Sequence, residues 1–204
     1  MLKFPAAAIT TTDAYYSTES GPSGLSSISV GLATFEFDAE THETLLRCDQ
    51  IDLDLDDLSA LSDKSFEFPL NPEPGYIDGS ICLFGVHVHF LTERLSFGSV
   101  GEETIPLRID GILEFSSSGL SRYEDVALSF HTGLHLPLTS GQLVSMAADA
   151  IDRVAARSQH DIGKVMALLA KNQRAKDRLA ELHSEVRRAL QERDASIEIE
   201  RDPD

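Results

Sequence analysis

The 204-residue sequence contains no tryptophan, only two cysteines and half as many basic as acidic residues. The lack of tryptophan disfavours a carbohydrate or single-stranded nucleic-acid platform built on stacked aromatic rings. Cys48 and Cys82 are too few for a disulfide framework, so both are expected to be reduced thiols. No apolar run is long enough for a signal peptide or a membrane span. We therefore expect a cytoplasmic protein that does not bind membranes.

Acidic residues dominate the first part of the chain. Residues 1–140 contain 22 acidic and 6 basic residues, a net charge of −16, whereas residues 141–204 contain 12 and 11. A negative surplus of this size argues against a nucleic-acid partner, because phosphate backbones require the opposite charge. It is compatible with simple solubility and with a basic protein partner. Residues 196–204 are expected to form an acidic tail.

Strand-like patterns occupy the middle of the chain. Between residues 28 and 138, apolar and polar residues alternate in successive segments that are separated by turn residues, with no helical period between them. Parallel strands need crossover connections, which are usually helical, so this pattern predicts an antiparallel β-sandwich or barrel. Residues 1–27 are rich in small and hydroxyl-bearing side chains and are predicted to form a flexible N-terminal arm.

The periodicity becomes helical after residue 138. Thr139 or Ser140 is expected to cap a first helix, with Gln142 near the capping-box position. Asp161 is expected to cap a second helix, which completes a helical hairpin over residues 139–195. The predicted fold class is therefore α+β, an antiparallel β domain followed by a C-terminal helical hairpin.

Apolar residues in the expected second helix recur at the spacing of a coiled-coil seam. The seam positions are Val165, Leu168, Asn172, Leu179, Leu182 and Val186. In an antiparallel pair of chains Lys171 would face Glu192, and Arg178 would face Glu185. This pattern is compatible with an antiparallel homodimer through residues 162–193. The alternative, which remains open, is that the seam packs on the first helix or on the sheet of its own chain.

Histidines gather in the longest apolar strand pattern, residues 75–98. The segment HVHFLTE resembles the H-x-H-x3-E core of the first cupin motif, which implies a metal-dependent enzyme on a β-barrel. The second cupin motif is missing, and a histidine from a later strand would have to complete the set. The candidate ligands are His87, His89, Glu93, His131 and His135. The strand that carries Arg108 is expected to lie between the two histidine strands, which disfavours a cation. Polar-face histidines are the alternative interpretation.

Aspartates alternate with apolar residues on and after one expected strand. They are Asp52, Asp54, Asp56 and Asp57. A calcium loop would need a glycine among these acids, and none is present. Solvation and protection of a sheet edge are the simpler roles for such residues.

Motifs for nucleophilic catalysis and for nucleotide binding are absent from the sequence. We therefore favour a non-catalytic, immunity- or adaptor-like interaction protein, in which the four aspartates bind a basic protein partner. No cofactor is predicted apart from the metal of the cupin-like alternative. A third interpretation is a structural subunit of a larger assembly.

Overall fold

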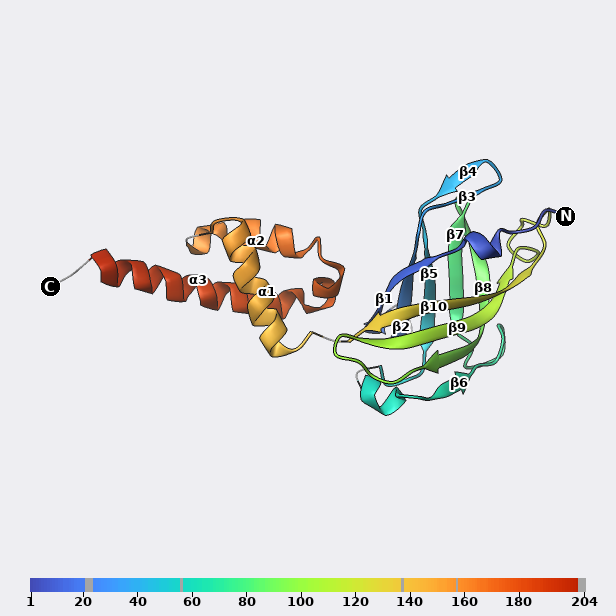
Figure 1. The fold of residues 1–204 in the computed structure, drawn as a ribbon, viewed down its shortest axis with the longest axis horizontal. Helices are drawn as coiled ribbons and strands as arrows, with labels where there is room; N and C mark the ends of the chain where they lie inside the picture. The colour runs from blue at the N-terminus through green and yellow to red at the C-terminus, as the bar shows by residue number, and fades with distance from the viewer. Residues whose placement is uncertain (21–23, 56, 137, 157, 202–204) are drawn as a thin grey trace. The chain divides into compact units, whose positions relative to one another are not determined.

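The computed structural model describes residues 1–20, 24–55, 57–136, 138–156 and 158–201. The chain divides into two compact units, Met1–Leu136 and Pro137–Asp204. The first is built from strands and the second from helices, so the protein belongs to the α+β class (Figure 1). Each unit has its own core of buried apolar side chains.

The first unit, here called the barrel unit, also contains two short 3-10 helices, η1 (Ala6–Ala8) and η2 (Leu58–Leu61). Its strands are β1 (Thr11–Ser20), β2 (Leu25–Leu32), β3 (Phe35–Phe37), β4 (Glu40–His42), β5 (Leu45–Ile51), β6 (Ser65–Glu67), β7 (Asp78–Leu83), β8 (Val86–Phe97), β9 (Thr104–Glu114) and β10 (Val126–His135).

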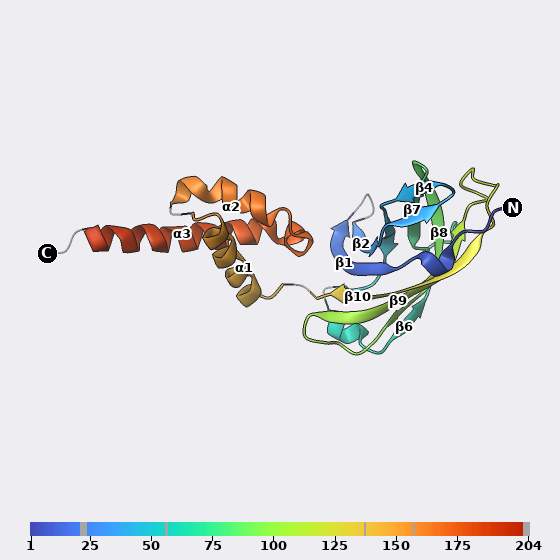
Figure 2. The same cartoon turned by 45° about the horizontal axis from the view of Figure 1, so that its top comes forward.

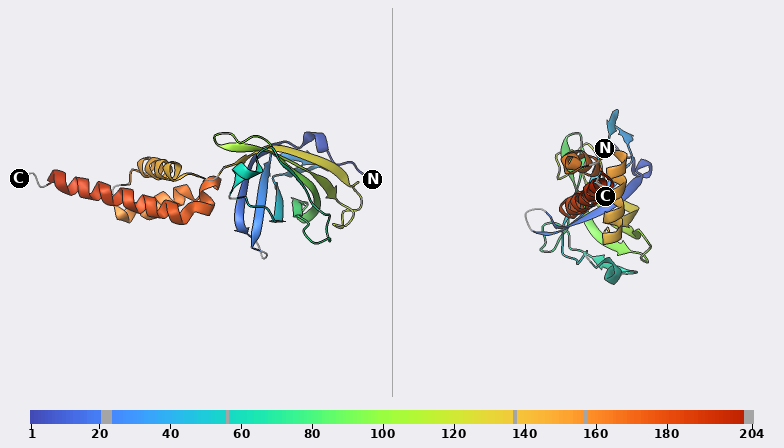
Figure 3. Two further views of the ribbon diagram at one scale, coloured as in Figure 1. Left: turned by 90° about the horizontal axis from the view of Figure 1, so that it is seen from below. Right: turned by 90° about the vertical axis from the view of Figure 1, so that its left-hand side faces the viewer.

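Seven strands close into a barrel. The hydrogen-bonded order is β8-β7-β5-β2-β1-β10-β9, and β9 pairs with β8 to complete the circle. Figures 2 and 3 show the curved sheet from further directions. Strand β6 extends the sheet along β8, and β3 and β4 form a separate hairpin. All neighbours in the barrel are antiparallel except β1 and β10, which are parallel. Of the two predicted architectures, sandwich or barrel, the structure contains the barrel, and it is mixed rather than purely antiparallel.

The parallel pair arises in the segment that was expected to be a flexible arm. Residues 11–20 pair with β2 along their length and meet β10 at Asp13↔Gly133 and Ala14↔Leu134. The prediction of an arm is wrong for this segment. Its hydroxyl-rich composition resembles a loop, but its backbone pairs with neighbouring strands. The side chain of Ala14 is fully buried in the barrel core.

The histidine-rich stretch, residues 75–98, forms two strands rather than one. Phe84 and Gly85 have φ angles of 54° and 72°, and they form the two-residue turn between β7 and β8. The reversal makes Cys82 and His87 neighbours on the outer surface, where both are exposed. A Phe-Gly turn lacks the asparagine or aspartate that marks most such turns, so the sequence pattern did not reveal it.

Apolar side chains fill the interior of the barrel. They include Ile28, Val30, Leu46, Ile81, Leu83, Val88, Phe90, Leu95, Ile105, Ile109 and Leu113. Packing is so close at Gly111 that an added Cβ would lie 2.3 Å from the Leu91 carbonyl oxygen and 2.7 Å from the Phe90 ring. Close packing of this kind is typical of protein interiors, so the inside of the barrel is a hydrophobic core.

Two separate groups of side chains belong to the segments before and after β5. The β3–β4 hairpin leads into the start of the strand and carries part of an aromatic cluster of Phe4, Phe35, Phe37, His42, Phe84, Phe115 and Tyr123. Beyond the end of the strand, Leu55, Leu58 and Leu61 are buried in the same core. The loop that carries these leucines also carries the aspartates predicted to bind a partner.

The second unit, here called the helical unit, begins with the predicted cap. Thr139 Oγ1 accepts a hydrogen bond from the backbone N–H of Gln142 at 3.2 Å, and Gln142 Oε1 accepts one from Thr139 N–H at 2.8 Å. This capping box starts α1 (Ser140–Arg153). The rest of the unit consists of η3 (Gln159–Asp161), α2 (Ile162–Leu169), η4 (Gln173–Arg178) and α3 (Leu179–Arg201).

The expected second helix is interrupted, so the predicted helical hairpin is present only in part. Asn172 has extended backbone angles, and its side chain accepts a hydrogen bond from Arg174 N–H at 3.0 Å. Asparagine favours helix caps over helix interiors, because its side chain competes for backbone groups. Helices α2 and α3 are consequently separate, and both contact α1. None of the helices in the described residues is both long enough and apolar enough to span a membrane.

Candidate functional site

The aspartates that follow β5 lie in a loop rather than on a strand. Strand β5 ends at Ile51, and the Ser26 hydroxyl reaches the Leu53 carbonyl oxygen at 3.5 Å. Along the loop the apolar side chains turn toward the core, whereas Asp52, Asp54 and Asp57 are exposed. The alternation in the sequence therefore separates core from solvent as expected, but these acids do not protect a strand edge. Asp56 lies outside the described residues.

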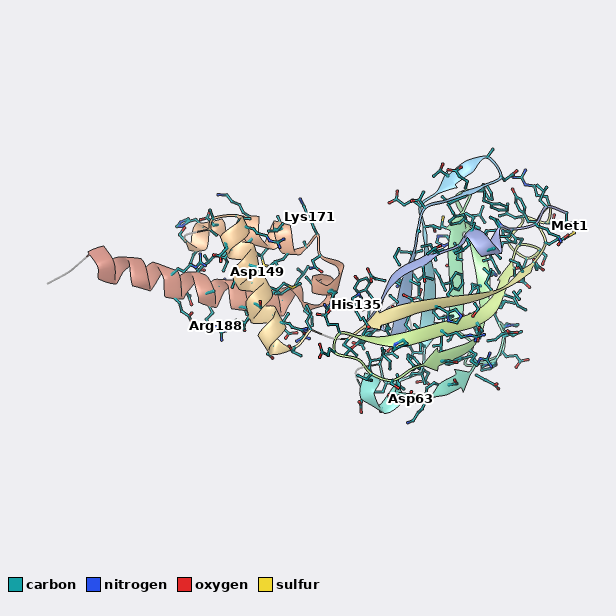
Figure 4. All side chains as sticks on the ribbon, in the orientation of Figure 1. Met1, Asp63, His135, Asp149, Lys171 and Arg188 are labelled. Atoms are coloured by element: carbon teal, nitrogen blue, oxygen red, sulfur yellow. The ribbon has the colours of Figure 1, made fainter. Side chains whose placement is uncertain are left out.

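A second loop, between β8 and β9, is attached to the first by hydrogen bonds. The Asp63 N–H donates to the Gly98 carbonyl oxygen at 3.1 Å, and the Ser99 hydroxyl donates to Asp63 Oδ1 at 2.8 Å. Glu102 and Glu103 in this second loop are exposed. Figure 4 labels Asp63, which lies beside η2.

We call the exposed acids of these two loops the acidic end of the barrel unit. They are Asp52, Asp54, Asp57, Asp63, Glu102 and Glu103. Among the described residues of these two loops, the basic residue is Lys64. Sequence reasoning found the aspartates after β5 but missed the two glutamates, because only the fold brings the second loop beside the first.

The basic residues of the barrel unit are mostly engaged by acids elsewhere. Four of the unit's 6 basic residues form ion pairs: Arg47 with Asp49, Arg94 and Arg108 with Asp110, and Arg122 with Asp38. These pairs lie outside the two loops of the acidic end. Most of the unit's positive charge is therefore held away from its main group of exposed acids.

The candidate metal ligands do not come together. His87 and His89 are exposed on β8, while His131 and His135 lie on β10, with β9 between the two strands. As expected, Arg108 on β9 is opposite His131. Within the described ranges, no group of three or more histidine, cysteine, aspartate or glutamate side chains is placed to hold a metal ion. The cupin-like ligand set is not assembled.

His135 has partners that the sequence did not suggest. Its Nε2 lies 3.2 Å from Asp13 Oδ1, and its ring stacks on Tyr15 at a centroid distance of 4.8 Å. Both partners belong to β1, the segment predicted to be flexible. This contact therefore fastens β1 to the end of β10, which is a structural role.

The most strongly perturbed carboxyl group is Asp110, on the outer face of β9. Burial alone would raise its pKa, but hydrogen bonds from Ser129, Arg108 and Arg94 outweigh burial and lower the pKa to about 2. The three donors come from β8, β9 and β10. Asp110 is thus a permanently ionised link across three strands, unsuited to proton transfer near neutral pH.

Both cysteines are free thiols in different surroundings. Burial raises the pKa of the Cys48 thiol to about 12, and its sulfur lies 3.7 Å from the Thr92 hydroxyl. Cys82 is exposed on β7 beside His87. A thiol with so high a pKa is not a nucleophile at neutral pH, so Cys48 is a core residue.

The predicted self-association residues have partners in their own chain. Val165, Leu182 and Val186 are fully buried in the core of the helical unit. Leu168 and Leu179 pack against the same core, and Asn172 ends the helical run. Since α2 and α3 are separate helices, the seam is not continuous over residues 162–193. Packing within one chain, the alternative to the homodimer, is what the structure contains.

Comparison with known proteins adds no identity: no family model, curated protein or solved structure matches this chain.

Proposed function

We propose that the protein is a non-catalytic interaction protein whose barrel unit binds a basic segment of a partner protein through the acidic end. The observation that carries this proposal is the gathering of six exposed carboxylates on two adjoining loops. Buried leucines anchor the first loop, and hydrogen bonds attach the second to it. The carboxylates are therefore presented by a fixed backbone, which lowers the entropy cost of binding.

Electrostatic attraction would supply most of the recognition. A surplus of 16 negative charges on the barrel unit would attract a basic partner over long distances and accelerate association. Each exposed ion pair contributes only about 0.2–1 kcal/mol, so several must form together for useful affinity. This requirement favours a partner segment with several lysines or arginines over a single basic residue.

A reducing compartment suits this proposal. Both cysteines are free, and the exposed Cys82 has no second exposed cysteine in the described residues to pair with. We therefore place the interaction in the cytoplasm, where thiols remain reduced.

The proposal is tested by titrating the full chain with a flexible lysine–glycine peptide at low salt and following binding by fluorescence anisotropy. The triple variant Asp52→Asn/Asp54→Asn/Asp57→Asn is expected to bind about tenfold more weakly, because three attractive contacts of this size are lost.

The matched control removes three carboxylates elsewhere on the barrel unit. Glu40, Glu43 and Glu73 are exposed and lie outside the acidic end. The variant Glu40→Gln/Glu43→Gln/Glu73→Gln makes the same change in net charge and is expected to keep nearly full affinity. Equal losses in the two variants would mean that total charge, and not the acidic end, determines binding.

A further inference from the structure

Strand β10 has one edge that is only partly paired. Its β9 edge is paired from Val126 to His135 without a break. On the opposite edge, the backbone of β1 pairs with it at Gly133 and Leu134. Side-chain hydrogen bonds also join Thr132 to the Thr12 carbonyl oxygen and Thr11 to the His131 carbonyl oxygen. The barrel is therefore closed at this seam by a short parallel contact, and no strand of the described residues pairs with this edge over residues 126–132.

The direction of the backbone groups on β10 follows from its neighbours. The Pro106 carbonyl oxygen accepts a hydrogen bond from Gly98 N–H, so it points toward β8 and away from Gly133, its opposite residue on β10. In antiparallel sheets, hydrogen-bonded and non-hydrogen-bonded pairs alternate. Ala127, Ser129 and His131 are therefore in non-hydrogen-bonded pairs with β9, and their N–H and C=O groups point toward the open edge.

The N-terminal segment contacts the strand near His131 and the residues just before it, and it leaves a gap between these contacts. Leu2 exchanges two backbone hydrogen bonds with Arg122 and Glu124. The Thr11 hydroxyl donates to the His131 carbonyl oxygen. Between these two places, the backbone groups of Ala127 and Ser129 have no strand partner in the part of the chain that the structure describes.

A groove lies in this gap. It has a volume of about 220 Å³ and is lined by Ala6, Ile9 and Thr10 on one side and by residues 128–131 of β10 on the other. Ala6 and Ile9 pack against the barrel core, so the groove combines an apolar wall with a row of backbone hydrogen-bonding groups. This combination suits an extended peptide, which adds as a strand and places alternate side chains against the wall.

We infer that the open edge of β10 at Ala127 and Ser129 binds an extended basic segment of a partner protein by strand addition. We infer the charge of the bound segment from the charged residues around the groove and from the net charge of the unit. Residues 1–14 and 124–135 contain 3 acidic residues and 1 basic residue, and the whole unit has a net charge of −16. Two copies of so acidic a unit repel each other, which disfavours a second copy of this chain. The inference rests on the proposed function, because both require a basic partner.

The test compares two peptides of equal charge. A peptide of alternating lysine and valine favours an extended strand, and its N-methylated counterpart has the same side chains but no backbone N–H donors. Binding of both to the full chain is measured by fluorescence anisotropy. The N-methylated peptide is expected to bind about tenfold more weakly, since it cannot donate to the carbonyl oxygens of Ala127 and Ser129.

Two variants of the protein test the same edge from the other side. Ala127→Pro removes one N–H that points toward the open edge beside the groove, and proline is tolerated in a strand where its N–H would face away from the ladder. Ala127→Ser keeps the N–H and is the control. We expect Ala127→Pro to weaken binding of the lysine–valine peptide and Ala127→Ser to leave it unchanged. The N-methylated peptide keeps the test decisive if the proline variant fails to fold.

The outcomes separate the two proposals. If both peptides bind the wild-type chain equally well and depend on Asp52, Asp54 and Asp57, strand addition is wrong and the proposed function stands. If neither peptide binds at low salt, the proposed function fails and this inference fails with it. Sedimentation provides the remaining outcome: a wild-type dimer that Ala127→Pro converts to a monomer would assign the edge to a second copy.

Discussion

The two units of the protein differ in how they balance charge. The helical unit contains 12 acidic and 11 basic residues. Its described ion pairs are Lys164–Asp161, Arg178–Glu181, Arg188–Glu185 and Arg193–Asp152, all within the unit. The barrel unit contains 22 acidic and 6 basic residues. Even with every base paired to a different acid, 16 acids of the barrel unit would have no basic partner within it.

The two units therefore use their charged residues differently. In the helical unit, ion pairs connect residues one turn apart on the helix surface or link α3 to α1. In the barrel unit, Asp110 is the clearest example of a carboxylate that supports the fold, because it accepts hydrogen bonds from three strands. The surplus weakens the unit through self-repulsion, so its benefit must come from solubility or from binding.

The largest difference in stability between the two units is expected when a single glycine of the barrel unit is substituted. Gly111→Ala would force a Cβ into the Leu91 backbone and the Phe90 ring, and it should destabilise the barrel unit by about 3 kcal/mol. Gly163→Ala is the control in the helical unit, where a Cβ meets nothing within 4 Å. Thermal unfolding followed by near-UV and far-UV circular dichroism should show early loss of the barrel with the helices retained. Simultaneous loss of both would mean that the two units fold as one.

The core of the helical unit can be tested at Leu182. Leu182→Ala removes a fully buried side chain and should cost about 3 kcal/mol of unfolding free energy, whereas the half-buried Leu179 should cost less when changed to alanine. Denaturant unfolding followed by far-UV circular dichroism measures the difference. Sedimentation of the same variants should give the mass of the wild type. A change from dimer to monomer would restore the coiled-coil interpretation of the sequence.

A smaller effect is expected on the pH dependence of the stability of the barrel unit. The pKa of Asp110 is about 2 in the folded chain, below its ordinary value of 3.8, so its ion pairs stabilise the protein fully above about pH 4. This contribution, about 2 kcal/mol, is lost as the pH falls toward 2. Asp110→Asn should lose it at all pH values and should flatten the acid branch of the stability curve. Asp52→Asn, at the exposed acidic end, should leave that branch unchanged.

Thiol labelling gives the smallest effect and distinguishes the inside of the barrel from its outside. Cys82 is exposed and should react with an alkylating reagent in the native protein. Cys48 should react only after unfolding, because burial excludes the reagent and raises the pKa of the thiol to about 12. Mass spectrometry of the labelled chain counts the modified thiols. Rapid native labelling of Cys48 would show that the barrel opens readily.

Sequence patterns predicted the features that depend on local chemistry. The alternation in β9, the change to helical periodicity and the capping box at Thr139 were each visible in neighbouring residues and are present in the structure. The same is true of Asp52 and Asp54, because alternation with leucine separates core from solvent even outside a strand.

Features that depend on distant residues were not predictable in this way. Strand β1 is defined by its partners β2 and β10, and its own residues resemble those of a loop. The Phe84-Gly85 turn is supported by stacking of Phe84 on Tyr123, which lies far away in the sequence. Glu102 and Glu103 join the acidic end only because hydrogen bonds attach their loop to Asp63.

NMR can map directly whether a basic peptide binds at the acidic end of the barrel unit. Backbone amide signals of the full chain are followed while the lysine–glycine peptide is added at low salt. We expect shifts concentrated in residues 52–63 and 98–103, which reverse when salt is raised and the attraction is screened. Shifts spread evenly over the barrel surface, or confined to the helical unit, would contradict the proposed function.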